Sequence, residues 1–282
     1  MKLKLVYLLG AGRSGTTIMA TILGGHPEIE TVGELHQFLD HIVEGKNCSC
    51  EESLKTCSFW KAVLNNLKLS KDTFSNQQQI SNALEQHRNI PSLLFRSKPN
   101  KEYLEIHEAI FEAIKNNTKK TTLLDSSKYI SRYLLLKRSA KISVKGIYVV
   151  RDVRGVINSF QKKVQTSRSP FSTILYYSLV NLIGQWVCWT DKNVMKVKYE
   201  DFIEHPEETL NQIYEHVEIE NKESFFNNIY DIPHIIGGNR LKHQKRVTLK
   251  KDEKWKEVIP RYKQIMYYLF TFPLMMFNKY KV

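Results

Sequence analysis

Residues 10–17 read GAGRSGTT, and this stretch decides the fold of the chain. Its glycine spacing is that of a phosphate-binding loop, G-x-x-x-x-G-K-[ST], except that Thr16 occupies the lysine position. In nucleoside triphosphatases that lysine reaches the β- and γ-phosphates, so its absence argues against ATP hydrolysis. The backbone N–H groups of such a loop can still bind another anionic group. A glycine-rich turn without a ligand is the alternative interpretation.

The segments on either side of the loop are typical of a strand and a helix. Residues 3–9 form a short apolar run that ends in glycine, as a buried parallel strand does. Residues 16–23 have a helical pattern, which stops at Gly24 and Gly25. The order strand, glycine-rich turn, helix is the one that a phosphate-binding loop requires.

The rest of the chain alternates between apolar strands and helices, which predicts an α/β fold with a central parallel β-sheet flanked by helices on both faces. Residues 59–117 are expected to be mostly helical with a break at the glutamine-rich residues 76–79, and residues 234–256 to form a mobile loop. We predict one domain over residues 1–282. The predicted strands cover residues 121–125, 145–150 and 194–199; the predicted helices cover 130–138, 172–190 and 206–216, and another begins within 151–160.

The composition is that of a basic globular protein. In 282 residues there are 42 Lys and Arg against 29 Asp and Glu, a net charge of +13. This charge favours an anionic ligand, a polyanion or a membrane surface, without selecting among them. The apolar segment 265–277 contains Pro273 and is too short to span a bilayer. Because no secretory signal is convincing, we expect a cytoplasmic protein and leave peripheral membrane contact open.

Three of the four cysteines lie close together in the stretch NCSCEESLKTCSFW. Cys48, Cys50 and Cys57 could hold a metal with His41 as the fourth ligand, but a C-x-C followed by a six-residue gap is not a usual zinc spacing. We therefore favour a loop with free thiols or one local disulfide, and predict no metal site. Cys188, between two tryptophans, is expected to be a core residue.

Residues 8–34, LLGAGRSGTTIMATILGGHPEIETVGE, resemble the 5′-phosphosulfate loop of sulfotransferases that use 3′-phosphoadenosine 5′-phosphosulfate (PAPS), especially the tyrosylprotein and carbohydrate branches. Three further segments resemble family motifs in the right order, and GGNR at 237–240 shows a weaker resemblance. They are DSSK (125–128), RDVRGVINSF (151–160) and KYEDFIEHPEETL (198–210). The resemblance implies a single P-loop-like domain, with PAPS as co-substrate and no metal.

A PAPS site needs two anion pockets, one for the 5′-phosphosulfate and one for the 3′-phosphate. The first can be formed by the Arg13 guanidinium and the backbone N–H groups of the loop, from Ser14, Gly15, Thr16 and Thr17.

The resemblance assigns the second pocket to Arg151 and Ser159, of which the arginine offers a planar fork to phosphate oxygens. Tyr199 is a candidate for the adenine side, or a core tyrosine. Arg240 and the basic run around it are expected to close over the nucleotide, or to be a solvated charge run.

The catalytic candidates are Glu34, Lys128 and Arg13. The resemblance implies that Glu34 is the base that removes the acceptor proton, and His36 competes with it because imidazole titrates near neutral pH. Lys128 is the candidate cation near the bridging oxygen and the transferred sulfuryl group. The alternatives are a helix-start role for Glu34 and a solvated lysine at 128.

The leading hypothesis is a sulfotransferase that acts in line on a hydroxyl group, or on an amine. The acceptor, which could be a glycan, a tyrosine, a lipid or a small metabolite, is expected to contact a helical insertion at about 36–117 and residues 163–180. A basic loop and helix at about 234–282 complete the predicted domain.

The alternative function is a phosphotransferase with a degenerate phosphate loop, for which Asp125 is the nearest magnesium candidate. The third hypothesis is a nucleic-acid-binding protein. No nucleic-acid-binding signature supports the third.

Overall fold

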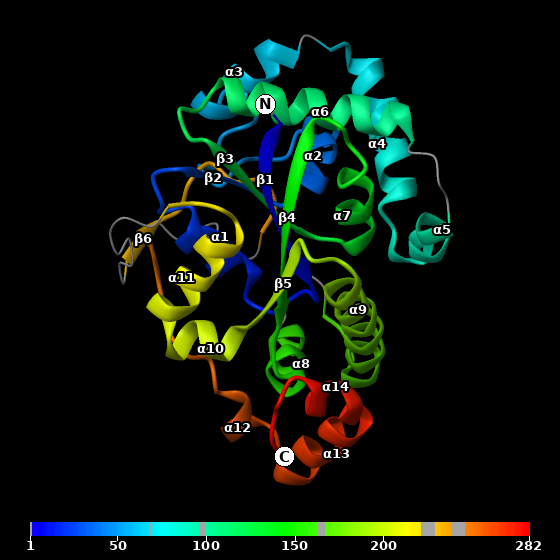
Figure 1. The fold of residues 1–282 in the computed structure, drawn as a ribbon, viewed down its shortest axis with the longest axis vertical. Helices are drawn as coiled ribbons and strands as arrows, with labels where there is room; N and C mark the ends of the chain where they lie inside the picture. The colour runs from blue at the N-terminus through cyan, green and yellow to red at the C-terminus, as the bar shows by residue number, and fades with distance from the viewer. Residues whose placement is uncertain (1, 68, 96–99, 163–166, 221–228, 239–245) are drawn as a thin grey trace.

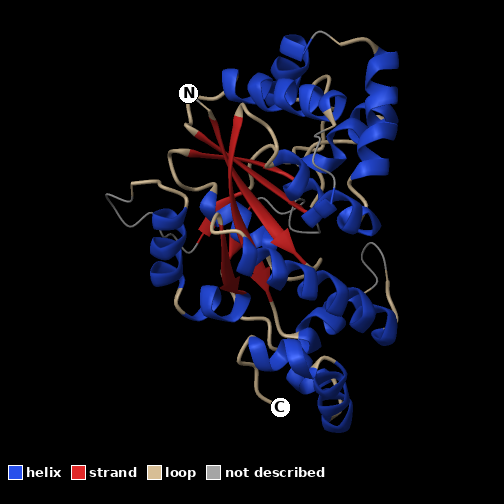
Figure 2. Cartoon of the chain, turned by 45° about the vertical axis from the view of Figure 1, so that its right-hand side comes forward, coloured by secondary structure: helices blue, strands red, loops and turns tan. Residues whose placement is uncertain are grey.

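The computed structural model describes residues 2–67, 69–95, 100–162, 167–220, 229–238 and 246–282. Its centre is a five-stranded parallel sheet, seen edge-on in Figure 1 and fanned out in Figure 2. In spatial order the strands are β2 (Ile29–Gly33), β3 (Thr122–Lys128), β1 (Leu3–Gly10), β4 (Ile142–Val150) and β5 (Val194–Lys198).

The central strand β1 is apolar on both sides, which explains the two helical layers. Successive side chains of a strand point to opposite faces. Leu5 and Tyr7 belong to one buried cluster, and Val6 and Leu8 belong to another. Both faces must therefore be covered, and the predicted arrangement is confirmed. One face packs against α1 (Thr16–Leu23), α10 (Tyr199–Glu204) and α11 (Pro206–His216), the other against α7 (Ile130–Leu136) and α9 (Pro170–Thr190).

The edge strand β2 lies where the sequence analysis expects no strand. Its residues, IETVG, include Glu30 and Thr31 and therefore lack the apolar run that marks the other strands. Pairing with β3 sets its position, with Ile29 opposite Thr122 in parallel register. Because β2 ends at Gly33, it delivers Glu34 directly to the carboxyl edge of the sheet.

A helical layer covers the upper end of the molecule in Figure 1. The expected break at residues 76–79 is wrong, because α4 continues through it. The glutamines there bridge neighbouring helices: Gln77 Nε2 donates to Glu102 at 2.8 Å, and Gln78 Nε2 donates to Asp40 at 2.6 Å. The layer contains α2 (Phe38–Glu44), α3 (Ser58–Leu67), α4 (Lys71–Leu84), α5 (Ile90–Phe95) and α6 (Lys101–Asn116), with short 3-10 turns η1 (Leu35–Gln37) and η2 (His87–Asn89).

The C-terminal part of the chain packs below the sheet, against α8 and α9 (Figure 1). Within the predicted loop 234–256, residues 246–248 form a strand that pairs with residues 229–231, whereas 239–245 lie outside the described residues. No helix among the described residues is both long and apolar enough to cross a membrane. The elements are α8 (Val153–Gln161), β6 (Ile229–Asp231), β7 (Arg246–Thr248), α12 (Trp255–Val258), α13 (Arg261–Phe270) and α14 (Phe272–Phe277).

Candidate active site

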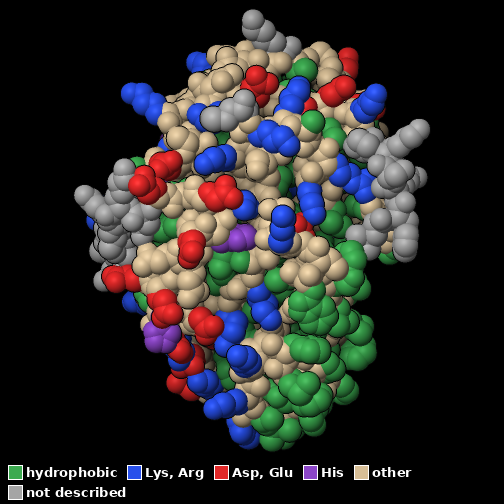
Figure 3. Space-filling model, viewed as in Figure 1, with side chains coloured by type: hydrophobic (Ala, Val, Ile, Leu, Met, Phe, Trp, Pro, Cys, Tyr) green, Lys and Arg blue, Asp and Glu red, His purple; other side chains and the backbone are tan. Residues whose placement is uncertain are grey.

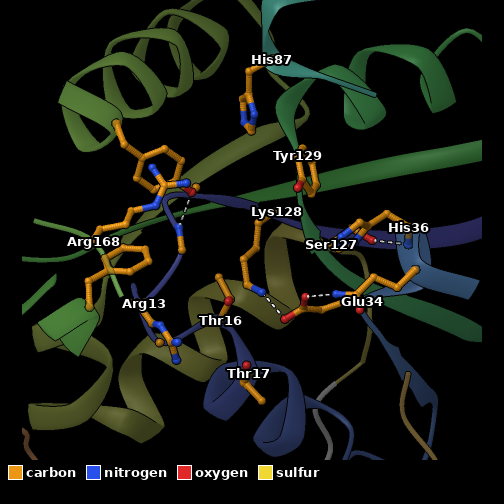
Figure 4. A pocket seen from close by; sticks show the side chains of 16 residues that line it. Arg13, Thr16, Thr17, Glu34, His36, His87, Ser127, Lys128, Tyr129 and Arg168 are labelled. Carbon is orange, nitrogen blue, oxygen red and sulfur yellow. Dashed lines mark hydrogen bonds and ion pairs between the residues drawn. The ribbon is translucent and has the colours of Figure 1, made fainter. Parts of the chain in front are cut away.

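A cleft of about 390 Å³ opens where β1 and β3 end, and the glycine-rich loop forms part of its wall. Ligands of parallel α/β sheets bind at this edge, and the volume suits a small molecule. Figure 4 shows Arg13, Thr16 and Thr17 on one side of the cleft and Glu34 and Lys128 opposite them. The structure therefore brings the predicted loop and the three catalytic candidates together.

The conformation of the loop depends on Gly15. Its φ is +90°, a left-handed value that glycine adopts without strain. A Cβ atom at this position would lie 2.2 Å from Cδ2 of Tyr199, so the aromatic ring packs directly on the glycine backbone. The predicted adenine-side residue and the glycine-rich loop are thus in contact.

The N-terminus of α1 is available to an anion. No side chain in the described part of the chain caps this helix, and Thr16 and Thr17 occupy its first turn at the wall of the cleft. Ser14 is fully buried, and its Oγ has no hydrogen-bond partner among the described residues. A buried hydroxyl without a partner is unfavourable. The loop thus has free hydrogen-bonding capacity that fits a phosphate or sulfate group.

Arg13 and Lys128 share an unusual backbone conformation. Their φ angles are +68° and +73°, values that cost a non-glycine residue about 1–3 kcal/mol and that cluster at functional sites. The guanidinium of Arg13 lies 5.6 Å from the centre of the Phe160 ring. Burial lowers the pKa of Arg13, while the nearby Glu34 carboxylate opposes that change.

Glu34 and Lys128 form an ion pair at the wall of the cleft, between Oε1 and Nζ (Figure 4). The other carboxylate oxygen of Glu34 accepts a hydrogen bond from Gln37 Nε2 at 2.8 Å. Both oxygens are therefore oriented, and the base candidate and the cation candidate are adjacent.

Asp125, the nearest magnesium candidate in the sequence, has a structural role. Its buried Oδ1 accepts hydrogen bonds from the backbone N–H of Leu35 at 3.3 Å and of Ser127 at 2.9 Å. Its Oδ2 lies 3.0 Å from Nε of Arg132, which is also fully buried. These donors occupy the carboxylate, so it does not fit a magnesium ligand. It instead fixes η1, the turn that follows Glu34.

His36, the competing base, also lines the cleft. Its backbone N–H donates to Ser127 Oγ at 2.9 Å, and its ring packs 4.7 Å from that of Tyr129. Desolvation of the ring, followed by the charges of Lys128 and Arg132, lowers the pKa of His36 well below its usual value. The imidazole is therefore neutral near pH 7 and a weak base.

Arg151 lies at the end of β4, beside the loop. Its Nη1 donates to the carbonyl of Arg13 at 3.1 Å, and its guanidinium lies 4.3 Å from the centre of the Tyr199 ring. Its Nη2 is 3.3 Å from Oδ2 of Asp252, a contact that the sequence did not predict.

Ser159 is half-buried on α8 and is not among the residues that line the cleft. Arg240 lies outside the described residues.

Sequence reasoning did not predict the aromatic and basic wall of the cleft. Tyr176 accepts a hydrogen bond from the backbone N–H of Gly12 at 2.8 Å, and Arg168 stacks on the Tyr176 ring at 4.5 Å. His87 and Tyr129 also line the cleft, and Figure 4 shows them on the other side from Arg168. These residues belong to no motif, so only the fold reveals that they meet.

Comparisons with known proteins show the family and the fold of the chain. The model of the sulfotransferase family matches residues 6–223, more than half of the chain, and the chain therefore belongs to the sulfotransferase family. Its fold is similar to that of the sulfotransferase domain of the olefin synthase of Synechococcus PCC 7002, with a TM-score of 0.61, 18% identity and coverage of 100% of this chain and 97% of that one. The fold is also similar to that of the sulfotransferase domain of the curacin biosynthetic pathway, with a TM-score of 0.61, 19% identity and coverage of 99% of this chain and 98% of that one. No curated protein sequence matches the chain.

Proposed function

We propose that the protein transfers a sulfuryl group from PAPS to a hydroxyl group. One observation carries the proposal: the uncapped N-terminus of α1 and the Glu34–Lys128 pair lie in the same cleft. An anion-binding helix end next to a paired carboxylate and ammonium group suits the transfer of a charged group to an acceptor that must lose a proton.

The donor site has two parts in this proposal. The backbone N–H groups of the loop and Arg13 bind the 5′-phosphosulfate, and the orphaned Ser14 hydroxyl supports this assignment. Arg151 binds the 3′-phosphate, with Tyr199 beside it on the adenine side. The hydrogen bond from Arg151 to the Arg13 carbonyl supports the pairing of the two parts, because it fixes their separation.

In the proposed reaction, the bond between sulfur and the bridging oxygen of the donor breaks, and a bond to the acceptor oxygen forms. Glu34 takes the acceptor proton, and the hydrogen bond from Gln37 keeps its carboxylate oriented. Lys128 and Arg13 stabilise the negative charge on the phosphate that leaves and on the sulfuryl oxygens. Sulfuryl transfer resembles phosphoryl transfer, in which positioning and electrostatics supply most of the rate enhancement. We infer no role for a metal at this step.

We propose a hydroxyl-bearing acceptor that enters along the wall of His87, Tyr129, Arg168 and Tyr176. Aromatic rings and one guanidinium offer stacking surfaces for a sugar or an aromatic ring. The helical insertion at residues 36–117 contributes His87 to this wall, in keeping with an acceptor-side role.

Calorimetric titration tests the donor. We expect 3′-phosphoadenosine 5′-phosphate to bind more tightly than ADP or ATP with magnesium, because only the bisphosphate carries the group that Arg151 binds. Arg151→Ala should weaken the binding of the bisphosphate by at least tenfold, which corresponds to about 1.4 kcal/mol. The binding of ADP should be nearly unchanged. Tighter binding of ATP with magnesium would overturn the proposal in favour of a phosphotransferase.

A further inference from the structure

Three cysteines and one histidine outside the cleft converge on a single point. Cys48, Cys50, Cys57 and His234 each present one ligand atom, and these four atoms lie within 4.8 Å of one another. Nδ1 of His234 is 3.2 Å from Sγ of Cys57 and 3.9 Å from Sγ of Cys48. His41, the fourth ligand considered in the sequence analysis, instead donates from Nδ1 to the carbonyl of Gln37 at 2.9 Å.

These distances suit a tetrahedral zinc site. Zinc binds thiolate sulfur at about 2.3 Å and imidazole nitrogen at about 2.0–2.1 Å, which puts neighbouring ligand atoms roughly 3.5–3.8 Å apart. The two distances from His234 fall on either side of that range, so a small movement completes the tetrahedron. Three thiolates and one imidazole form a closed ligand set, the type found in structural zinc sites.

The surroundings hold the ligands in place. The backbone N–H of Cys50 donates to the sulfur of Cys48, and those of Phe59 and Trp60 donate to the sulfur of Cys57. Such outer contacts orient metal ligands. The ring of His234 stacks on that of Phe59 at 6.3 Å with an angle of 10° between the planes.

The cluster joins segments that are 186 residues apart in the chain. Ser49 Oγ donates to the carbonyl of Pro233 at 2.6 Å, and the N–H of Ser49 donates to the carbonyl of Ile235 at 3.1 Å. The same segment continues to the candidate base, because the N–H of Glu34 donates to the carbonyl of Ile236 at 2.7 Å.

We propose that Cys48, Cys50, Cys57 and His234 bind one zinc ion, which fixes residues 233–236 against β2 beside Glu34. The spacing of the cysteines alone gave no usual zinc motif, because the fourth ligand comes from a distant segment. The site has no open position, so its role is structural, and it can be tested without an activity assay.

Elemental analysis tests the proposal directly. The purified wild-type protein should contain one zinc per chain after passage over a chelating resin, and Cys188→Ser, which changes the cysteine outside the cluster, should match it. Cys50→Ser and His234→Ala should lose most of the metal. EDTA should lower the melting temperature of the wild type and of Cys188→Ser, with little effect on the two ligand variants.

Cobalt gives a second test that needs no variant to fold. The wild-type protein, stripped of metal and loaded with cobalt, should show the visible bands of tetrahedral thiolate coordination. Wild-type protein that takes up neither zinc nor cobalt would overturn the proposal. A cysteine–cysteine linkage within the cluster, found by mass spectrometry in metal-free protein, would also overturn it.

A second inference comes from an independent feature, a large exposed apolar face. Figure 3 shows it at the lower right, over the region of α9, α13 and α14 in Figure 1. Four large apolar side chains on α9 follow helical spacing, and each has 41–57% of its surface exposed. They are Leu175, Leu179, Leu182 and Trp186. The patch continues onto the C-terminal helices, because the ring of Trp189 lies 5.8 Å from that of Phe277.

Across α9 and residues 261–282, the charged side chains are of one sign. No residue of α9 is charged, and residues 261–282 carry four cations and no carboxylate side chain. A second copy of the chain would bring these like charges together, whereas anionic lipids would attract them. Apolar side chains bordered by cations are typical of surfaces that insert into a bilayer interface.

We infer that α9, α13 and α14 dock on an anionic lipid bilayer. Wild-type protein should sediment with vesicles that contain phosphatidylserine and much less with pure phosphatidylcholine. The double variant Leu179→Glu, Phe270→Glu should lose this binding at least tenfold, and Gln212→Glu on the polar surface of α11 is the control. A stable dimer that does not bind vesicles would overturn the inference, as would a monomer that binds neither vesicle type.

Discussion

At the residue scale, the contact between Arg151 and Asp252 identifies a carboxylate at the proposed 3′-phosphate position. Burial alone would raise the pKa of Asp252, but Arg151 and Lys162 lower it on balance, so the group is ionised. Two anions cannot share one guanidinium without repulsion. Asp252 must therefore release Arg151 before the phosphate binds there.

We predict that Asp252→Asn tightens the binding of 3′-phosphoadenosine 5′-phosphate. The contact is partly exposed, so a gain of about 1 kcal/mol, or roughly fivefold, is expected by calorimetry. Glu257→Gln, which removes an exposed carboxylate that does not contact Arg151, should have a much smaller effect. An equal gain for ADP, which lacks the 3′-phosphate, would contradict this account.

Variants of Glu34 and His36 distinguish which of the two residues is the base. Glu34→Gln should retain nucleotide binding, because the side chain keeps its size, and should lower the transfer rate by about 10²–10⁴-fold. His36→Asn should keep most of the activity, since its depressed pKa makes the ring a poor proton acceptor. A radiolabelled transfer assay with a panel of hydroxyl acceptors measures both. The reverse result would make His36 the base.

At the scale of elements, the position of η1 depends on a buried ionic network. Arg132 is fully buried and contacts Asp125 at 3.0 Å and Glu85 at 2.5 Å. These contacts join β3, α7 and the end of α4, and Asp125 also holds the turn that carries His36 and Gln37. The network therefore connects the helical layer to the site.

We expect Asp125→Asn to lower the free energy of unfolding by about 3–5 kcal/mol, because it leaves the Arg132 charge without one of its partners. Asp201→Asn is the matched control: its pair with Lys198 is exposed and should contribute less than about 1 kcal/mol. Urea unfolding followed by circular dichroism compares the two. Equal losses would show that the buried network adds little.

The elements also show what sequence patterns can predict. Strands β1, β3, β4 and β5 contain apolar runs, and all four were predicted. Strand β2 was not, because Glu30 and Thr31 are stabilised there by pairing with β3 and not by an apolar pattern. The glutamines of α4 resembled a break because their cross-helix partners are invisible in the sequence.

The candidate site likewise contains residues that the sequence predicted and residues that it did not. The family resemblance implied that Arg13, Glu34, Lys128 and Arg151 serve one site, and the structure places the first three in one cleft with Arg151 beside the glycine-rich loop. The aromatic wall, Asp252 and the link from Cys57 to His234 depend on tertiary contacts between distant segments. No local pattern encodes such contacts.

At the scale of the whole molecule, buried histidines make stability depend on pH. Burial, followed by the charge of Arg132, lowers the pKa of His107 well below 6.5. Between the folded pKa and 6.5 only the unfolded chain binds this proton, so stability is full above about pH 6.5 and falls as the pH decreases. The largest slope from one such group is about 1.4 kcal/mol per pH unit.

We predict that His107→Gln reduces the pH dependence of unfolding between pH 6.5 and 5 by about one proton. Glutamine can still bond Ser81, which lies 3.1 Å from His107 Nε2. The exposed His205→Gln is the control and should keep the wild-type slope. Urea midpoints measured across this range provide the comparison, and parallel curves for His107→Gln and the wild type would refute the assignment.

The backbone pairing between β2 and residue 236 has a consequence for synthesis of the chain. Gly33 and Ile236 form a parallel bridge at the open edge of the sheet, and a Cβ on Gly33 would lie 2.3 Å from the carbonyl oxygen of Ile236. About 200 residues must be translated after β2 before this partner leaves the ribosome. Until then the edge of β2 is uncovered and open to pairing with other chains. Translation that stalls before residue 236 should therefore yield nascent chains that need a chaperone.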